Sequence, residues 1–129
     1  MGSPTKCEFY GLAPQFVVPD VVRSAEYYRE KLGFEILGYF LDPPVFAIVR
    51  RDGAEIHFGK SDKGEVKVND SVRRGLGTDA YIFISNVISL FDELRARGVK
   101  IVDGPTERPY GRTEITVVDE DGYQIVFGE

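Results

Sequence analysis

Hydrophobic residues recur at helical spacing in residues 21–32, which predicts an amphipathic helix there. One face of this helix collects the apolar side chains of Val21, Ala25, Tyr28 and Leu32. Asp20 is placed to cap the first turn, because a carboxylate accepts hydrogen bonds from backbone N–H groups that lack a helical partner. Gly33 is placed to end the helix, because glycine readily adopts the left-handed conformation found at helix ends.

The same pattern returns in the second half of the chain. Residues 87–97 place four apolar side chains on an inward face, namely Val87, Leu90, Phe91 and Leu94. Asn86 stands where a cap is expected, and Gly98 stands where the helix should end. The chain therefore predicts two amphipathic helices with equivalent start and stop signals.

Alternating, β-rich segments surround both predicted helices. The segments expected to form strands are 12–18, 34–41, 45–51, 54–58, 79–84, 99–103, 113–118 and 123–127. The order β-α-β-β-β therefore occurs twice. The closing strands also begin alike, since Asp52-Gly53 precedes one and Asp121-Gly122 precedes the other. A duplicated unit of this kind predicts two packed modules with a cleft at their seam.

The length of 129 residues suits one domain with its own core. We expect a flexible leader over residues 1–11 and a single domain over residues 12–128. Within that domain, module one covers about 12–59, a polar connector covers 60–78, and module two covers about 79–128.

Composition excludes several classes of function. No apolar run is long enough to cross a bilayer, and the first residues lack the pattern of a secretory signal. A net charge of −5 and the absence of a basic run argue against a nucleic-acid surface. The single cysteine, Cys7, cannot form an internal disulfide, which fits a reducing cytoplasm. We therefore expect a cytoplasmic protein that binds neither nucleic acid nor a membrane.

Several motifs together resemble the vicinal oxygen chelate superfamily, in its glyoxalase and bleomycin-resistance branch. In chain order they are Val18-Pro19-Asp20, residues 24–28, Leu32-Gly33-Phe34, Pro109-Tyr110-Gly111-Arg112 and residues 119–123. The resemblance covers about residues 12–127. It implies an α+β fold in which tandem β-α-β-β-β modules form a curved mixed sheet, an open barrel around a cavity, with the helices outside. It also implies a homodimer whose subunits share ligand grooves.

Metal-dependent members of the resembled family place ligands on the first and last strand of each module. Carried onto this chain, these places fall at Ala13, His57, Asp79 and Val126. Two of the four cannot coordinate a metal, and divalent sites normally need three or four His or carboxylate ligands. We therefore expect no metal and no cofactor. Glu55 and Glu114 leave open an atypical site with His57 and Asp79.

Strand alternation selects the side chains that would line the cavity. On residues 79–84 the odd positions face inward, which leaves Ala80, Ile82 and Ile84 to pack under the helices. Tyr110 joins them from a loop that borders the ligand groove in the resembled branch. The predicted ligand-binding residues are Gln15, Glu55, His57, Asp79, Tyr81, Phe83, Tyr110 and Glu114. Rings and carboxylates on one face suit a planar, aromatic or cationic small molecule.

Four functions are compatible with these residues. The first is a metal-free protein that sequesters a small molecule, as drug-resistance members of the resembled branch do. The alternative is a divalent-metal lyase, isomerase or dioxygenase that uses His57. A metal-free enzyme with His57 or Glu55 as base lies between the two. The last is an association module, which a cavity well below roughly 300 Å³ would favour.

Overall fold

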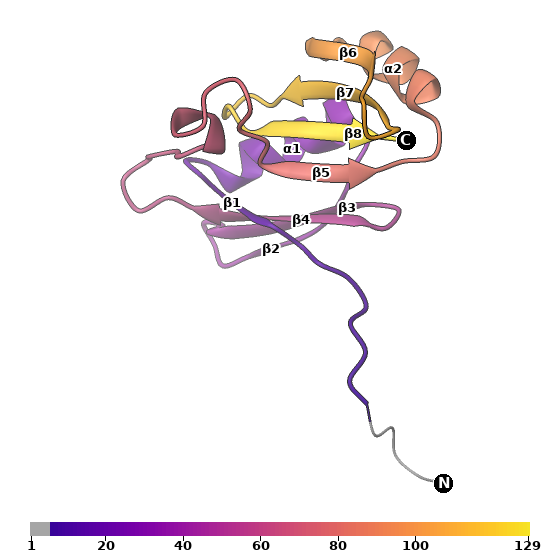
Figure 1. Cartoon of the computed structure of the whole chain (residues 1–129). Helices are drawn as coiled ribbons and strands as arrows, with labels where there is room; N and C mark the ends of the chain where they lie inside the picture. The colour runs from indigo at the N-terminus through magenta and orange to yellow at the C-terminus, as the bar shows by residue number, and fades with distance from the viewer. Residues whose placement is uncertain (1–5) are drawn as a thin grey trace, which may run out of the picture.

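The chain forms two β-α-β-β-β units joined by a connector (Figure 1). In the computed structural model, which describes residues 6–129, the first unit contains β1 (Gln15–Val18), α1 (Val21–Leu32), β2 (Glu35–Phe40), β3 (Phe46–Arg51) and β4 (Ala54–Lys60). The second contains β5 (Ala80–Phe83), α2 (Val87–Ala96), β6 (Ile101–Glu107), β7 (Thr113–Val118) and β8 (Gln124–Gly128). A short 3₁₀ helix, η1 (Asn69–Ser71), lies in the connector. The predicted tandem arrangement is confirmed.

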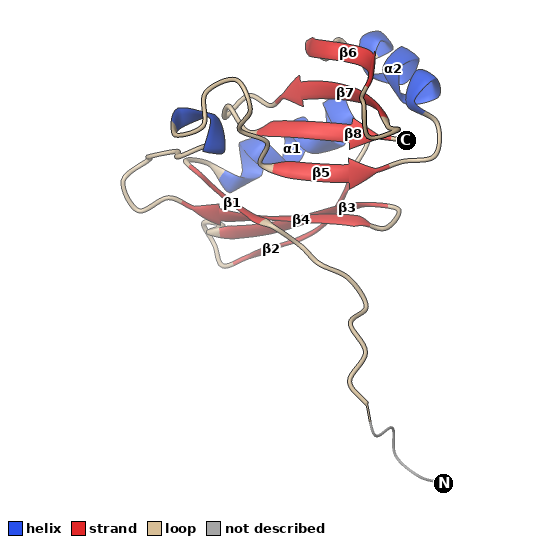
Figure 2. Cartoon of the chain, in the orientation of Figure 1, coloured by secondary structure: helices blue, strands red, loops and turns tan. Residues whose placement is uncertain are grey.

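The strands form two four-stranded mixed sheets, seen in Figure 2 as separate red groups. The first has the order β1-β4-β3-β2, and the second has the equivalent order β5-β8-β7-β6. In each sheet the first strand of the unit pairs in parallel with the last, and the remaining pairs are antiparallel. The α+β class and the open arrangement are confirmed, with two sheets that do not close into a barrel.

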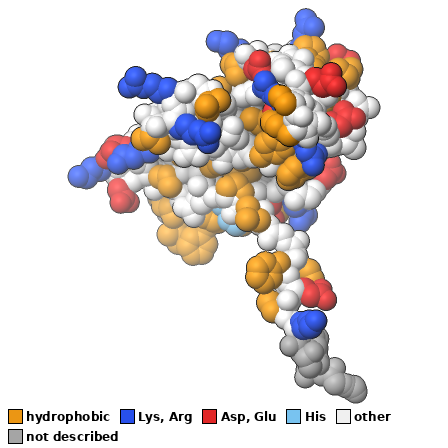
Figure 3. All heavy atoms as spheres, in the orientation of Figure 1, with side chains coloured by type: hydrophobic (Ala, Val, Ile, Leu, Met, Phe, Trp, Pro, Cys, Tyr) orange, Lys and Arg blue, Asp and Glu red, His pale blue; other side chains and the backbone are white. Residues whose placement is uncertain are grey.

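Several strands begin later than the alternation predicts. β1 begins at Gln15, where its pairing with His57 of β4 starts, and the carbonyl of Pro14 accepts the last bond of that ladder. Residues 6–14 contain neither helix nor strand and lead away from the body of the molecule (Figure 3). Residues 1–5 of the predicted leader lie outside the described residues. β6 begins at Ile101 because the N–H of Val99 instead bonds to the carbonyl of Leu94 and helps to end α2.

Both helices start and stop for the reasons that the sequence indicates. The Asp20 carboxylate accepts hydrogen bonds from the N–H groups of Val22 and Arg23, and Gly33 has a φ of 73°. The Asn86 side chain accepts from the N–H of Ser89. The residues that α1 buries include all four predicted ones, Val21, Ala25, Tyr28 and Leu32. No helix within residues 6–129 is long and apolar enough to cross a membrane.

The two modules pack together through a shared core at their seam. The ring of Phe16 on β1 stacks on Tyr123, with centroids 4.2 Å apart, and the Tyr123 hydroxyl donates to the carbonyl of Val17 at 2.6 Å. Tyr28 on α1 donates to Asp119, which lies before β8, at 2.6 Å. Asp119 is only 5% exposed, and this burial raises its pKa to about 6.

A second contact joins the helix of module two to the β3–β4 turn of module one. The Arg51 guanidinium forms a bidentate pair with Glu93 of α2, with N–O distances of 2.7 and 2.8 Å. It also donates to the carbonyl of Leu32 at 2.9 Å. Each helix therefore contacts the residues just before the last strand of the other module, α1 before β8 and α2 before β4. This reciprocity fixes where the two sheets lie relative to each other.

Candidate functional site

Each sheet has one face covered by a helix and one face without a helix. α1 packs on β2, β3 and β4, whereas α2 packs on β6 and β7. The fully buried residues alternate along the strands and lie on the helix-covered faces, for example Ala47, Val49, Ile56, Phe58, Ile115, Val117, Ile125 and Phe127. The intervening residues lie on what we call the helix-free face of each sheet, and the predicted site residues in the strands are among them.

Strand register shows which positions of the two modules are equivalent. Gln15 pairs with His57 across β1 and β4, and Tyr81 pairs with Val126 across β5 and β8. Gln15 and Tyr81 are therefore the strand positions opposite His57 and Val126. The resemblance to the family instead implies Ala13 and Asp79 as the ligand places on the first strands, and both of these residues lie before their strands. The two sets share a face, because they differ by two residues.

Tyr81 lies across the helix-free face of module two because the neighbouring strand has a glycine beneath it. A Cβ atom built on Gly128 would lie 2.6 Å from Cζ and 2.9 Å from Cε1 of the Tyr81 ring, which is closer than side chains approach. With no such atom, the ring reaches over β8 to β7. Its hydroxyl there donates to Glu114 at 2.5 Å.

Glu114 is the centre of a hydrogen-bonded cluster. Its carboxylate is 3% exposed and accepts from Tyr81, from Tyr110 at 2.7 Å and from the Arg108 Nε at 3.0 Å. Burial would raise the pKa of Glu114, but these donors outweigh it and lower that pKa. Burial and the bond to Glu114 raise the pKa of Tyr81 to about 12, so its phenol stays protonated at neutral pH.

Phe83 continues this aromatic surface toward solvent. Its ring centroid lies 5.1 Å from that of Tyr81, and the guanidinium carbon of Arg112 sits 4.7 Å above it. Phe83 nevertheless remains 69% exposed. We call Tyr81, Phe83 and Tyr110 the aromatic platform. An exposed ring held in place by its neighbours is suited to stacking against a planar ligand.

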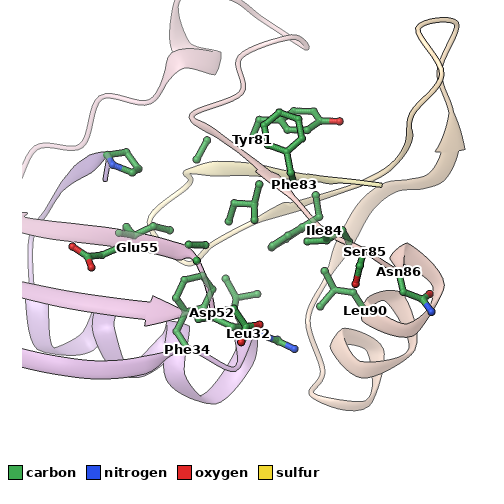
Figure 4. Close-up of a pocket in the computed structure, with 18 of the residues that line it drawn as sticks. Leu32, Phe34, Asp52, Glu55, Tyr81, Phe83, Ile84, Ser85, Asn86 and Leu90 are labelled. Carbon is green, nitrogen blue, oxygen red and sulfur yellow. The ribbon is translucent and has the colours of Figure 1, made fainter. Parts of the chain in front are cut away.

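A cavity of about 910 Å³ opens beside β5, within the size range of ligand pockets. Its walls include Tyr81 and Phe83, and apolar side chains of β5, α1 and α2 close its base. In Figure 4, Tyr81 and Phe83 project together to one side of β5, while the carboxylate of Glu55 points away from them. Its volume is larger than the roughly 300 Å³ below which an association module would be the expected function.

Glu55 and His57 form a separate pair on the helix-free face of module one. Their side chains lie 2.7 Å apart, between His57 Nε2 and Glu55 Oε2, and Phe46 packs edge-on against the imidazole. Gln15 lies over Gly59, which has no side chain, just as Tyr81 lies over Gly128. Within residues 6–129, no hydrogen bond or ion pair links this pair to the aromatic platform.

Asp79 lies directly before β5, and its carboxylate binds backbone N–H groups. One carboxylate oxygen accepts from the N–H of Asn69 at 2.9 Å, and the other accepts from the N–H of Gln124 at 2.8 Å. Asp79 therefore fastens the connector to the start of β8. Of the eight predicted residues, the structure brings together Tyr81, Phe83, Tyr110 and Glu114, and separately Glu55 and His57.

The residues around His57 do not fit a divalent metal of the kind that metal-dependent relatives hold. Its strand neighbours in the register are Gln15 and Ile48, and the equivalent place in module two is Val126. Across the described residues, no group of three or more His, Cys, Asp or Glu side chains converges on one point. The side chains around His57 therefore do not assemble the ligand set that a divalent metal needs.

Sequence reasoning overlooked three residues next to the platform or its supporting carboxylate Glu114, namely Arg108, Arg112 and Gly128. Gly128 could have been found from the repeat, because Phe58-Gly59 and Phe127-Gly128 end the closing strands of both modules. The two arginines carried no such signal, because the equivalent loop of module one, residues 41–45 between β2 and β3, contains no arginine.

The fold is similar to that of several solved proteins at low sequence identity. TioX from Micromonospora sp. ML1 matches with a TM-score of 0.73 and 18% identity, covering 92% of this chain and 97% of that one. A bleomycin-binding protein complexed with bleomycin matches with a TM-score of 0.71 and 17% identity, covering 92% and 96%. A superfamily member from Sphaerobacter thermophilus DSM 20745 matches with a TM-score of 0.70 and 20% identity, covering 95% and 98%.

No sequence among curated proteins matches this chain. The family model of the glyoxalase, bleomycin resistance protein and dioxygenase group, however, matches residues 12–127, which is nearly the whole sequence. That match agrees with the tandem modules and the strand order described above. The chain belongs to the Glyoxalase/Bleomycin resistance protein/Dioxygenase superfamily.

Proposed function

We propose that the protein binds a planar aromatic small molecule on the aromatic platform, without a metal. The observation that carries this proposal is the position of Phe83, which is 69% exposed beside a cavity of about 910 Å³. An exposed aromatic ring next to a cavity of ligand size gains most from a second ring stacked on it.

The cluster beneath the platform supports the same function. Glu114 accepts from the hydroxyl groups of Tyr81 and Tyr110, and these bonds hold both rings in one orientation. A surface that is fixed before binding loses less conformational entropy when the ligand arrives. The cluster thus prepares a rigid stacking surface, and it leaves Phe83 free to contact the ligand.

The structural relatives favour sequestration as the biological role. One of them is a bleomycin-binding protein with bleomycin bound, and its fold extends over 92% of this chain. Sequestration of a toxic aromatic compound in the cytoplasm would confer antibiotic resistance without any catalysis. The reduced state expected for Cys7 is compatible with that location.

After treatment with EDTA, the platform is tested by a fluorescence titration with N-phenyl-1-naphthylamine, a neutral probe with a naphthalene and a phenyl ring. We expect saturable binding to the wild type, a loss of at least about tenfold in affinity in Phe83→Ala, and abolition in the double variant Tyr81→Ala/Phe83→Ala. Phe9→Ala is the control, since Phe9 is also an exposed phenylalanine, at 94%, and lies in the segment before β1, outside both sheets. Unchanged affinity in the double variant would remove the proposal.

We further propose that a second copy of the chain completes the groove. The side chains that support this lie on strands yet are exposed, namely Val17, Leu37, Phe40 and Phe83. Apolar side chains gathered on sheet faces without a helix commonly mark a subunit interface. Sedimentation velocity should therefore detect a dimer, and dilution to the monomer should weaken probe binding. A monomer that binds the probe with full affinity would contradict a shared groove.

A further inference from the structure

We infer that the ligand carries an anionic group beside its aromatic ring, and that Arg112 recognises this group. The inference rests on the proposed function and narrows its ligand class. Its starting point is the Arg112 guanidinium, whose central carbon lies over the Phe83 ring, 4.7 Å from the ring centroid. Arg112 therefore borders the aromatic platform.

Arg112 is the unpaired cation of this surface. Across residues 6–129, its side chain forms no ion pair with a carboxylate and donates no hydrogen bond. The neighbouring arginine, Arg108, is in contrast fully engaged, because it binds Glu114 at 3.0 Å and Asp103 at 2.6 Å. A guanidinium presents a planar set of donors that matches a carboxylate or sulfonate, and it can do so while it stacks on a ring.

The acidic side chains that line the cavity, and Glu114 beneath the platform, are with one exception already bound by other groups of the protein. Glu114 accepts from three donors, and Asp79 accepts from two backbone N–H groups. Glu93 is bound by Arg51 and Arg97, and Glu55 by His57. Asp52, exposed in the β3–β4 turn, is the exception and lies in the other module. The carboxylates that suggested a cationic ligand from sequence are thus engaged by the protein, and a free positive charge remains at Phe83.

The chain contains a matched control for this arginine. Arg95 also sits over a phenylalanine, with its guanidinium carbon 5.5 Å from the Phe91 ring centroid on α2. In this second pair Arg95 is exposed and Phe91 packs partly against the core, and neither residue lines the cavity, whereas Phe83 does. If any cation stacked on a phenylalanine were sufficient to attract an anion, Arg95 and Arg112 would contribute equally to the affinity for an anionic ligand.

The test compares two fluorescent probes with the same rings, neutral N-phenyl-1-naphthylamine and anionic 1-anilinonaphthalene-8-sulfonate. We expect the wild type to bind the sulfonate at least about tenfold more tightly, the gain of a hydrogen-bonded charge pair. Arg112→Gln should remove this preference and leave the affinity for the neutral probe within about threefold. Arg95→Gln should keep the preference, and Arg112→Lys should keep part of it.

Each outcome separates this inference from the proposed function. Equal affinity for the two probes, or a preference that survives in Arg112→Gln, would overturn the anionic ligand and leave the aromatic platform intact. A neutral probe whose affinity is unchanged in Phe83→Ala would overturn the platform itself, and the role of Arg112 would fall with it.

Discussion

Replacement of Gly128 by alanine should displace Tyr81 from Glu114. The added methyl group would lie 2.6 Å from Cζ and 2.9 Å from Cε1 of the ring, and the rigid ring cannot yield as a flexible chain end would. The ring must therefore swing away from β8, which breaks its 2.5 Å hydrogen bond to the buried carboxylate of Glu114. One methyl group would then undo the support of the aromatic platform.

The expected change in the free energy of unfolding combines three contributions, of which two destabilise the protein and one stabilises it. A hydrogen bond to a charged group contributes about 1.5–3 kcal/mol, and Tyr81 falls toward the lower end because it is partly exposed. Steric overpacking adds about 1–3 kcal/mol. Alanine at a compatible backbone position restores only about 0.4–1 kcal/mol by restricting the unfolded chain. We therefore expect Gly128→Ala to lower the free energy of unfolding by about 2–4 kcal/mol.

Urea denaturation of a double-mutant cycle measures this effect. In a Tyr81→Ala background, Gly128→Ala should change the free energy of unfolding by less than about 1 kcal/mol, because no ring remains to be displaced. Gly59→Ala is the control at the equivalent place in module one, where the methyl group meets only the flexible end of Gln15. The reasoning is refuted if Gly128→Ala is neutral, or if it is equally destabilising without the Tyr81 ring.

Two further predictions concern the seam between the modules. Burial raises the pKa of Asp119 from its ordinary 3.8 to about 6, so its contribution to stability is present below the lower value and lost as the pH rises through the higher one. Between pH 4 and pH 7, the free energy of unfolding measured in urea should fall by roughly 2–3 kcal/mol more in the wild type than in Asp119→Asn. Equal changes in the two proteins would contradict this explanation. Arg51→Met should lower the free energy of unfolding by about 1 kcal/mol, and less in 0.5 M NaCl, because the pair with Glu93 is partly exposed and screened by salt. A salt-independent loss would show that packing, and not charge, accounts for the effect.

Much of the fold could be predicted from the sequence because its signals are local. Asp20 and Gly33 act within one turn of helix, so their chemistry is visible in neighbouring residues. The repeat added what local signals lack, since it predicted that both modules share one strand order. Strand ends were less predictable. β1 begins only at Gln15, although β4 already contains Glu55, the residue that would face Ala13. Pro14 lies between them and has no N–H group to donate, and the alternation of Ala13 and its neighbours does not encode where the pairing stops.

The candidate site depended on contacts between distant residues, and the sequence indicated it less completely. Alternation correctly placed Tyr81 and Phe83 on one face, because period-two patterns decide which side of a sheet a residue occupies. It gave no indication that Asp79 would bind backbone N–H groups of the connector and of β8. Nor did it indicate that Arg108 would neutralise Glu114, since this contact depends on how the loop between β6 and β7 folds back over β7.

A crystal structure of the EDTA-treated protein with 1-anilinonaphthalene-8-sulfonate tests the central claim most directly. The account predicts that the naphthalene ring stacks on Phe83, at the roughly 3.5–4 Å separation of carbon atoms in contact, with the sulfonate at Arg112. It also predicts that module one of a second copy closes the groove. A probe bound elsewhere, or a Phe83 ring covered by its own subunit, would contradict the account.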